Sequence, residues 1–341
     1  MSSTTTTAAP VVSTGWSWIV INSVPTRLIH YGFNTTTASN TISNDRFSSD
    51  KPIIVFISGN PGEVSYYEEL LALIHMQTKL SVIGLSHAGH NIIDNYSSNN
   101  NNQTKHNNEN KYLLNGQIDH KRQFIDNHLS GDSKIILIGH SIGCYIILEL
   151  MDGWETVRQK VLHSILIFPT IESMASTSQG SKCQFMFQYF KYPILALSYL
   201  LDNLSDSFKR RLIKLAMGST GTGSTGTDSS STTPPNCVVN AAINLFNPNC
   251  LMRSIEMALN EFNLVNELNT EAIAGNEQKL TFFYGDCDHW CPIDYYQKIS
   301  QLFPNCDIRL CLQDIDHAFV TDRQSTHRIS QLVVEKIQSI L

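Results

Sequence analysis

The chain lacks the excess of positive charge that a nucleic-acid-binding protein needs. Its 341 residues carry a formal net charge of −6, and charged residues make up only 16% of the total. Proteins that hold nucleic acid neutralise phosphates with clustered basic side chains. Nucleic acid is therefore not an expected partner. The hydrophobic content of 42% is ample for one large domain with a sizeable core.

The start of the chain also lacks the features of a secretory signal. Residues 1–10 are rich in Ser and Thr, with neither a basic stretch nor an apolar one. The eight cysteines are accordingly expected to be reduced thiols that face the cytosol. Metal binding is not expected, because the cysteines nearest one another lack the usual Cys-x2-Cys spacing of zinc sites. These cysteines, with a neighbouring histidine, are Cys287, Cys291, Cys306, Cys311 and His289.

A serine lies between two glycines at residues 139–143, in the order Gly-His-Ser-Ile-Gly. The apolar run 134–138 precedes it and a helical pattern over 144–150 follows. A strand that turns sharply into a helix, with a bare serine at the turn, is the nucleophile elbow of α/β-hydrolases. The glycines let strand and helix approach each other. Ser141 is the expected nucleophile, with a chance turn as the alternative, and His140 is expected to pack or to shape the turn.

The acid and the histidine of a catalytic triad are expected later in the chain, each after a strand. Residues 280–285 are typical of a buried strand and lead into an acidic loop. Residues 307–312 alternate like a last strand, and His317 follows. A histidine can accept the serine proton near neutral pH, while a carboxylate fixes its tautomer. We predict His317 as the base and Asp288 as the acid, with Asp286 as the alternative.

The oxyanion hole should take one N–H group from the loop after an earlier strand and one from the residue after the nucleophile. Residues 51–57 are typical of that strand, and residues 58–62 are its loop. Glycine and proline in the loop permit a close approach to the site. The N–H groups of Asn60 and Ile142 are the predicted donors. The alternative is that Asn-Pro-Gly is simply a good turn sequence.

Four short segments of this chain recur together in one protein family. They are Ser58-Gly59-Asn60-Pro61-Gly62, Gly139-His140-Ser141-Ile142-Gly143, Asp288-His289-Trp290-Cys291-Pro292 and Asp307-Ile308-Arg309-Leu310-Cys311. From about Thr14 to its end, the chain resembles the lipid droplet-associated hydrolases. The resemblance implies a serine lipid hydrolase of the droplet surface and of the cytosolic face of the endoplasmic reticulum, with sterol esters or other neutral lipids as substrates. It also selects Ser141, Asp288 and His317 as the triad. Ser58 departs from the family, in which proline is common, and leaves the loop less rigid.

The order of strand and helix patterns predicts an α/β-hydrolase fold with a mostly parallel, doubly wound sheet. The core is expected in two parts, residues 14–168 and residues 277–341. Residues 16–24 and 26–32 alternate like an opening antiparallel hairpin.

Four segments are expected to lie outside this core. The N-terminus, residues 1–13, is expected to be disordered. Residues 97–111 are rich in asparagine, and residues 218–235 are rich in Gly, Ser, Thr and Pro. Both can bury little apolar surface and are expected to be disordered loops. The insertion between the two parts of the core, residues 169–276, is the expected lid.

One segment of the lid, residues 185–201, is aromatic and aliphatic and almost free of charge. Gln188, Lys191 and Pro193 interrupt it, so it is not expected to span a bilayer. Tyrosines among phenylalanines suit an element that lies in a lipid monolayer. The predicted contacts with the monolayer are Phe187, Phe190, Ile194 and Leu197. The alternative is a lid that packs these side chains against the core, and the two arrangements can alternate.

The sequence as a whole predicts a serine carboxylic ester hydrolase that works through an acyl-enzyme, without metal or nucleotide cofactor. Its expected partners are a neutral lipid or ester substrate and the droplet monolayer. A second interpretation is a weakly active or inactive droplet protein that affects lipid storage by interaction, because a misplaced lid can silence a complete triad. Epoxide or haloalkane hydrolysis on the same fold would need an aspartate in place of Ser141.

Overall fold

The computed structural model describes residues 14–33, 47–92, 109–219, 234–311 and 314–341. The predicted disordered N-terminus lies outside these residues, as do most of the predicted loops 97–111 and 218–235. The last three residues of the first loop are helical, because they begin the 3₁₀ helix η2 (Glu109–Tyr112). The guanidinium of Arg253 covers the Tyr112 ring at 4.0 Å and anchors this turn.

Eight strands form a single sheet in the order β1-β2-β4-β3-β5-β6-β7-β8. The first two pairings, β1 with β2 and β2 with β4, are antiparallel, and all others are parallel. The predicted fold class is therefore confirmed, including the opening hairpin. The bounds are β1 (Thr14–Ile21), β2 (Val24–Tyr31), β3 (Ile53–Ile57), β4 (Val82–Leu85), β5 (Ile135–His140), β6 (Val161–Ile167), β7 (Leu280–Gly285) and β8 (Asp307–Cys311).

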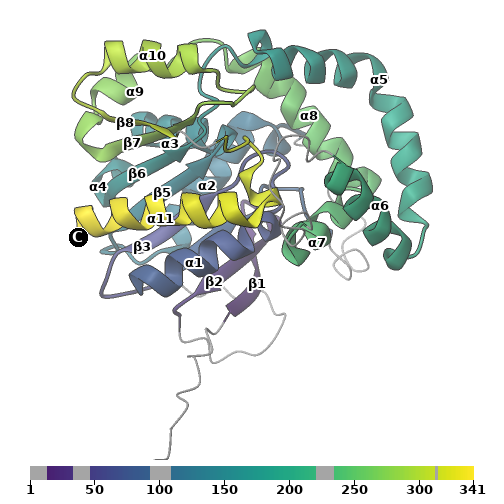
Figure 1. Ribbon diagram of the computed structural model, residues 1–341. Helices are drawn as coiled ribbons and strands as arrows, with labels where there is room; N and C mark the ends of the chain where they lie inside the picture. The colour runs from purple at the N-terminus through teal and green to yellow at the C-terminus, as the bar shows by residue number, and fades with distance from the viewer. Residues whose placement is uncertain (1–13, 34–46, 93–108, 220–233, 312–313) are drawn as a thin grey trace, which may run out of the picture.

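Helices cover both faces of the sheet (Figure 1). Helices α1 and α11 lie side by side over one face, and α2 and α3 pack together over the other. Every residue of β3, β4 and β5 is buried, which explains why these strands are continuous apolar runs. The helix bounds are α1 (Glu68–Thr78), α2 (Leu114–His128), α3 (Ile142–Gly153), α4 (Glu155–Lys160), α5 (Ser178–Asp202), α6 (Asp206–Ser219), α7 (Asn236–Asn244), α8 (Pro248–Leu264), α9 (Thr270–Ala274), α10 (Ile293–Leu302) and α11 (Arg323–Ile340).

The predicted lid segment contains α5 to α9. Helix α8 packs against α5 on one side and against α2 on another, so it lies between α5 and the core. Its start is well defined, because the Asn247 side chain accepts hydrogen bonds from two backbone N–H groups and Pro248 occupies the first turn. Helices α5 and α6 form the outer edge of the molecule, on the right in Figure 1.

Helix α5 is 25 residues long and contains Pro193. It bends in Figure 1 from the top of the molecule to its right side, as expected of a helix with an internal proline. Among the helices in the described part of the chain, none is long and apolar enough to span a membrane.

Candidate active site

Ser141 lies in the turn between the central strand β5 and helix α3. Its backbone has φ 55° and ψ −124°, a conformation that costs energy for any residue with a side chain. The flanking glycines leave no room for a methyl group. A Cβ atom at Gly143 would lie 2.3 Å from the Ile57 carbonyl oxygen, and one at Gly139 would lie 2.8 Å from the Gly143 backbone. The turn therefore depends on glycine at both positions.

The structure brings the three predicted triad residues together. Ser141 Oγ lies 2.9 Å from His317 Nε2, and His317 Nδ1 lies 2.6 Å from Asp288 Oδ2. Asp288 follows β7 and His317 follows β8, so the ends of parallel strands place both beside the serine. The Thr170 hydroxyl is a further neighbour of Ser141 Oγ, at 3.4 Å. No pattern in the sequence indicated Thr170.

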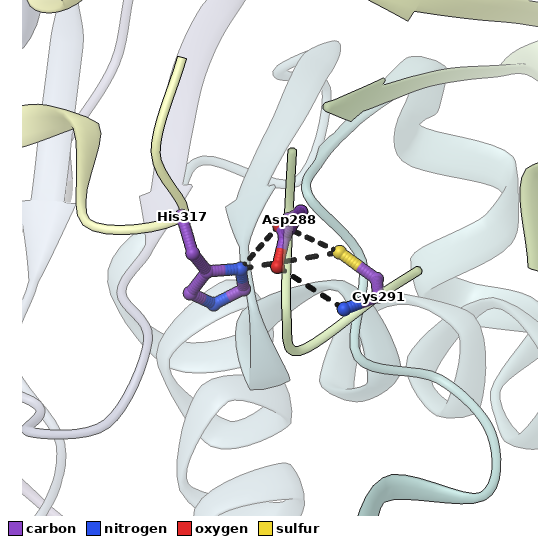
Figure 2. Close-up of side chains that lie close together, drawn as sticks. All are labelled: Asp288, Cys291 and His317. Atoms are coloured by element: carbon purple, nitrogen blue, oxygen red, sulfur yellow. Dashed lines mark hydrogen bonds and ion pairs between the residues drawn. The ribbon is translucent and has the colours of Figure 1, made fainter. Parts of the chain in front are cut away.

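Each of the two carboxylate oxygens of Asp288 accepts two hydrogen bonds. Oδ1 accepts from the backbone N–H groups of Trp290 (2.7 Å) and Cys291 (3.1 Å). Oδ2 accepts from His317 and from the Cys291 thiol, whose sulfur is 2.9 Å away (Figure 2). Burial alone would raise the pKa of Asp288, but the charge of His317 and these hydrogen bonds lower it below its ordinary value. The other aspartate of the loop, Asp286, lies beside Cys287 and Asp314 instead.

His140, expected only to pack or to shape the turn, connects two loops of the site. Its Nε2 lies 3.0 Å from the His317 carbonyl oxygen, and its Nδ1 lies 2.7 Å from the Tyr67 hydroxyl. Burial and the charge of His317 lower the pKa of His140 to about 3. The neutral ring therefore donates from Nε2 to the carbonyl and accepts the Tyr67 proton on Nδ1. Tyr67 oxygen in turn accepts from the Gly59 N–H (3.2 Å), which joins the loop after β3 to the loop of His317.

The loop after β3 has few N–H groups to offer an oxyanion. Gly59 donates to Tyr67, Gly62 donates to His90 Nδ1 at 2.9 Å, and Pro61 has no N–H group. Neither of those bonds uses the Asn60 N–H group, and its role as an oxyanion donor stays a prediction. The second predicted donor, Ile142, is the first residue of α3, where N–H groups have no carbonyl within the helix to bond.

The side chain of Asn60 forms hydrogen bonds to helix α8. Its Nδ2 donates to the Ser254 carbonyl (3.0 Å) and to Glu261 Oε1 (3.1 Å). Burial raises the pKa of Glu261 to about 8, although the bond from Asn60 acts in the opposite direction. This shift favours the neutral form of the Glu261 carboxyl group at neutral pH. No local pattern indicated this contact, because 201 residues separate its partners.

A cavity of about 410 Å³ opens onto the serine. This volume is within the range of small-molecule sites. Asn60, Ser141 and His317 lie on its wall, and most of its remaining lining is apolar. That lining comes largely from the lid segment and includes Met174, Phe187, Leu251, Ile255 and Ala258, together with Trp290.

The four predicted monolayer contacts all lie on α5, in different surroundings. Phe187 lines the cavity and packs against the core. Ile194 is half-buried. Phe190 and Leu197 are exposed, with 49% and 55% of their surface open to solvent. One helix thus contributes both to the cavity and to the outer surface.

Metal-ligand side chains meet in two groups of three within the described ranges. One is Asp288, Cys291 and His317, and the other is Asp286, Cys287 and Asp314. Each group contains only one of the four cysteines considered above as zinc ligands, Cys291 in the first and Cys287 in the second. In the first group, burial raises the pKa of the Cys291 thiol far above its ordinary value, and the thiol donates a hydrogen bond to Asp288 Oδ2.

The sheet order and the turn after its central strand define the α/β-hydrolase fold. Solved structures with this fold are similar to the chain over nearly its whole length. The haloalkane dehalogenase DatA from Agrobacterium tumefaciens C58 has a TM-score of 0.62 at 10% identity, with 96% of this chain and 97% of that chain covered. A serine hydrolase from Cycloclasticus zankles has a TM-score of 0.58 at 14% identity, covering 96% of this chain and 99% of that chain. At such low identity the likeness shows the fold alone.

The sequence comparisons are more specific. The chain belongs to the lipid-droplet associated hydrolase family, whose sequence model matches residues 50–320. The lipid droplet-associated hydrolase of Gallus gallus is 36% identical over 279 residues, covering 81% of this chain and 82% of the relative. That of Homo sapiens is 32% identical over 281 residues, covering 80% of each.

Proposed function

We propose that the chain is a serine hydrolase that cleaves carboxylic esters of neutral lipids, sterol esters among them, at the surface of lipid droplets. The observation that carries the proposal is the hydrogen-bonded chain from Ser141 through His317 to Asp288, which opens into an apolar cavity. The names of the relatives support both the hydrolase activity and the droplet location. The cytosolic face of the endoplasmic reticulum is the second proposed location.

The order of hydrogen bonds supports a distinct role for each residue of the proposed triad. His317 Nδ1–H donates to the Asp288 carboxylate, so the lone pair of Nε2 faces Ser141 Oγ. As Oγ attacks the ester carbonyl carbon, Nε2 takes the hydroxyl proton and Asp288 stabilises the imidazolium. His317 then gives that proton to the departing alcohol, which leaves an acyl group on Ser141. Water repeats the same steps and releases the carboxylic acid.

The negative oxygen of each tetrahedral intermediate needs hydrogen-bond donors fixed in advance. We assign this role to the N–H groups of Asn60 and Ile142. The loop of Asn60 is held by Tyr67 on one side and by α8 on the other. Because these contacts exist before substrate binds, little reorganisation is needed during the reaction.

The outer face of α5 is the proposed attachment to the droplet, and the segment 169–276 is the proposed lid. A helix that faces water normally carries polar residues on its outer side, and large exposed apolar patches mark interaction sites. Here, large apolar side chains are exposed over residues 185–200, which suits the boundary of a lipid monolayer. They are Phe185, Met186, Tyr189, Phe190, Tyr192, Leu197, Tyr199 and Leu200.

The test of the chemistry is covalent labelling with a fluorophosphonate, which reacts with an activated serine whatever its substrate. We expect the wild-type protein to be labelled and to hydrolyse emulsified neutral esters, and Ser141→Ala to do neither while it remains folded. Labelling of the variant would place the nucleophile elsewhere. A folded wild-type protein that is neither labelled nor active would support the alternative of a droplet protein that acts by interaction alone.

A further inference from the structure

Helix α6 is rich in positive charge on a chain whose net charge is −6. Its sequence, DSFKRRLIKLAMGS, contains four cationic side chains and one anionic side chain. One of the four, Lys209, is buried and pairs with Asp202 (3.4 Å) and Asp206 (3.7 Å). These bonds neutralise Lys209 and tie α6 to the end of α5. The three other cations are exposed: Arg210, Arg211 and Lys214.

Among the residues that the structure describes, acidic side chains do not neutralise these three cations. Within the described part of the chain, none of the three forms an ion pair. Arg210 donates to the Asn240 side-chain oxygen on α7, at 2.5 Å, which holds its stem against the protein. Arg211 and Lys214 extend into solvent. They are therefore free to meet an anionic partner.

The cations share the exposed face of α6 with large apolar side chains. Phe208, Arg211 and Leu215 follow one another at spacings of three and four residues, so they lie on the same side of the helix. Phe208 is 48% exposed and Leu215 is 72% exposed, whereas Ile213 on the opposite side is 7% exposed. Apolar residues flanked by Lys and Arg are the pattern of helices that lie in the surface of a membrane.

The exposed face of α6 carries positive charge, which the exposed face of α5 lacks. Over residues 185–200 the exposed side chains of α5 are apolar apart from Gln188, and the one basic residue, Lys191, is half-buried. Helices α5 and α6 lie beside each other at the right of Figure 1, on the edge remote from the sheet. The pair between Lys209 and Asp202 joins the start of α6 to the end of α5, so an apolar helix and a cationic helix adjoin at this edge.

We propose that α6 binds the anionic head groups of phospholipids while α5 contacts the apolar part of the same monolayer. The inference rests on the proposed attachment of α5 to the droplet and names the lipid class that the attached protein recognises. Cationic side chains near a lipid surface gain energy from negative head groups, and their long stems let the charge reach the phosphate while apolar neighbours insert. Phe208 and Leu215 favour a lipid surface over a nucleic acid, because nucleic acid backbones do not cover aliphatic side chains.

The experiment compares binding to triolein droplets coated with phosphatidylcholine alone or with phosphatidylcholine and phosphatidylserine. We expect the wild-type protein to bind the anionic droplets more tightly and to lose that preference at high salt. Each cation contributes roughly a fivefold gain. The variant Arg211→Gln/Lys214→Gln should therefore bind anionic droplets about thirtyfold more weakly and bind neutral droplets as the wild type does. Arg210 is left intact because of its bond to α7.

The matched control is Lys51→Gln/Arg328→Gln, which removes the same charge from two exposed positions outside α5 and α6. It should bind both kinds of droplet as the wild type does. Equal binding of wild type to neutral and anionic droplets would overturn the proposal. So would an equal loss by control and variant, or stronger binding to duplex DNA than to anionic droplets. Fluorophosphonate labelling of each variant reports the state of Ser141 separately, so failure of the hydrolase proposal is distinguishable from failure of this one.

Discussion

Replacing Asp288 by asparagine should disable the base without disturbing the fold. Two backbone N–H groups, from Trp290 and Cys291, fix the Oδ1 position. In Asp288→Asn, the amide oxygen must occupy that position, because only an oxygen can accept both bonds. The amide nitrogen then faces His317 Nδ1, at the site where Oδ2 now lies 2.6 Å away.

The new amide forces a change of tautomer. Its nitrogen can only donate, so His317 must accept on Nδ1 and carry its proton on Nε2. Nε2 lies 2.9 Å from Ser141 Oγ, and a protonated Nε2 cannot take the hydroxyl proton. In serine proteases this wrong tautomer lowers turnover by about 10⁴-fold, which corresponds to roughly 5 kcal/mol in the barrier. We expect a loss of this size here.

The assay measures kcat on a soluble chromogenic ester together with the rate of fluorophosphonate labelling. Asp286→Asn is the matched control, because Asp286 lies two residues away and contacts the loop of Asp314 instead of His317. It should retain activity within a few fold of the wild type. If Asp286→Asn were inactive and Asp288→Asn active, the roles of the two aspartates would have to be exchanged. Thermal unfolding of both variants excludes misfolding as the cause.

Three further predictions concern Glu261, His140 and the outer face of α5. Because burial raises the folded-state pKa of Glu261 from 4.5 to about 8, the contribution of Glu261 to the unfolding free energy should fall as pH rises from 4.5 through 8. Glu261→Gln should abolish this contribution, which is on the order of 3 to 5 kcal/mol. Urea titrations at several pH values measure the unfolding free energy of both proteins, and a difference between them that stays constant with pH would refute the prediction. His140→Leu removes the acceptor of the Tyr67 hydroxyl proton and the donor to the His317 carbonyl, so urea titration should show an unfolding free energy lower by about 2 to 5 kcal/mol. Phe190→Ser/Leu197→Ser should release the protein from droplets in flotation, since each inserted side chain contributes about 1.5 to 3 kcal/mol, and retention of the folded variant would mean that the attachment lies elsewhere.

Local patterns were enough to predict the strands and the positions of Ser141 and His317. A glycine-flanked serine after an apolar run has few structural alternatives, and the carboxyl ends of parallel strands meet at one edge of the sheet. The choice between Asp286 and Asp288 rested on loop length and family resemblance, and only the folded loop shows which carboxylate contacts His317. Contacts between distant segments carry no local signal. The bond from His140 to the His317 carbonyl spans 177 residues.

Helix α5 shows a different limit of prediction from sequence. An amphipathic helix reveals its buried side through the spacing of its apolar residues. In α5 both sides are apolar, so no spacing separates Phe187, which faces the cavity, from Phe190, which faces solvent. The sequence shows that residues 185–201 are apolar and almost free of charge. It could not assign its residues to the two sides.

The narrow space at Gly143 restricts how this enzyme family can diversify. One added methyl group would lie 2.3 Å from the Ile57 carbonyl, and Ile57 immediately precedes the loop that carries Asn60. A change at Gly143 would therefore displace the proposed oxyanion donor without touching any reacting group. The cavity wall from α5 and α8 has no such restriction, because side chains of many sizes can line an apolar space. New substrate preferences should arise through mutations in these helices, while the turn at Ser141 keeps one geometry.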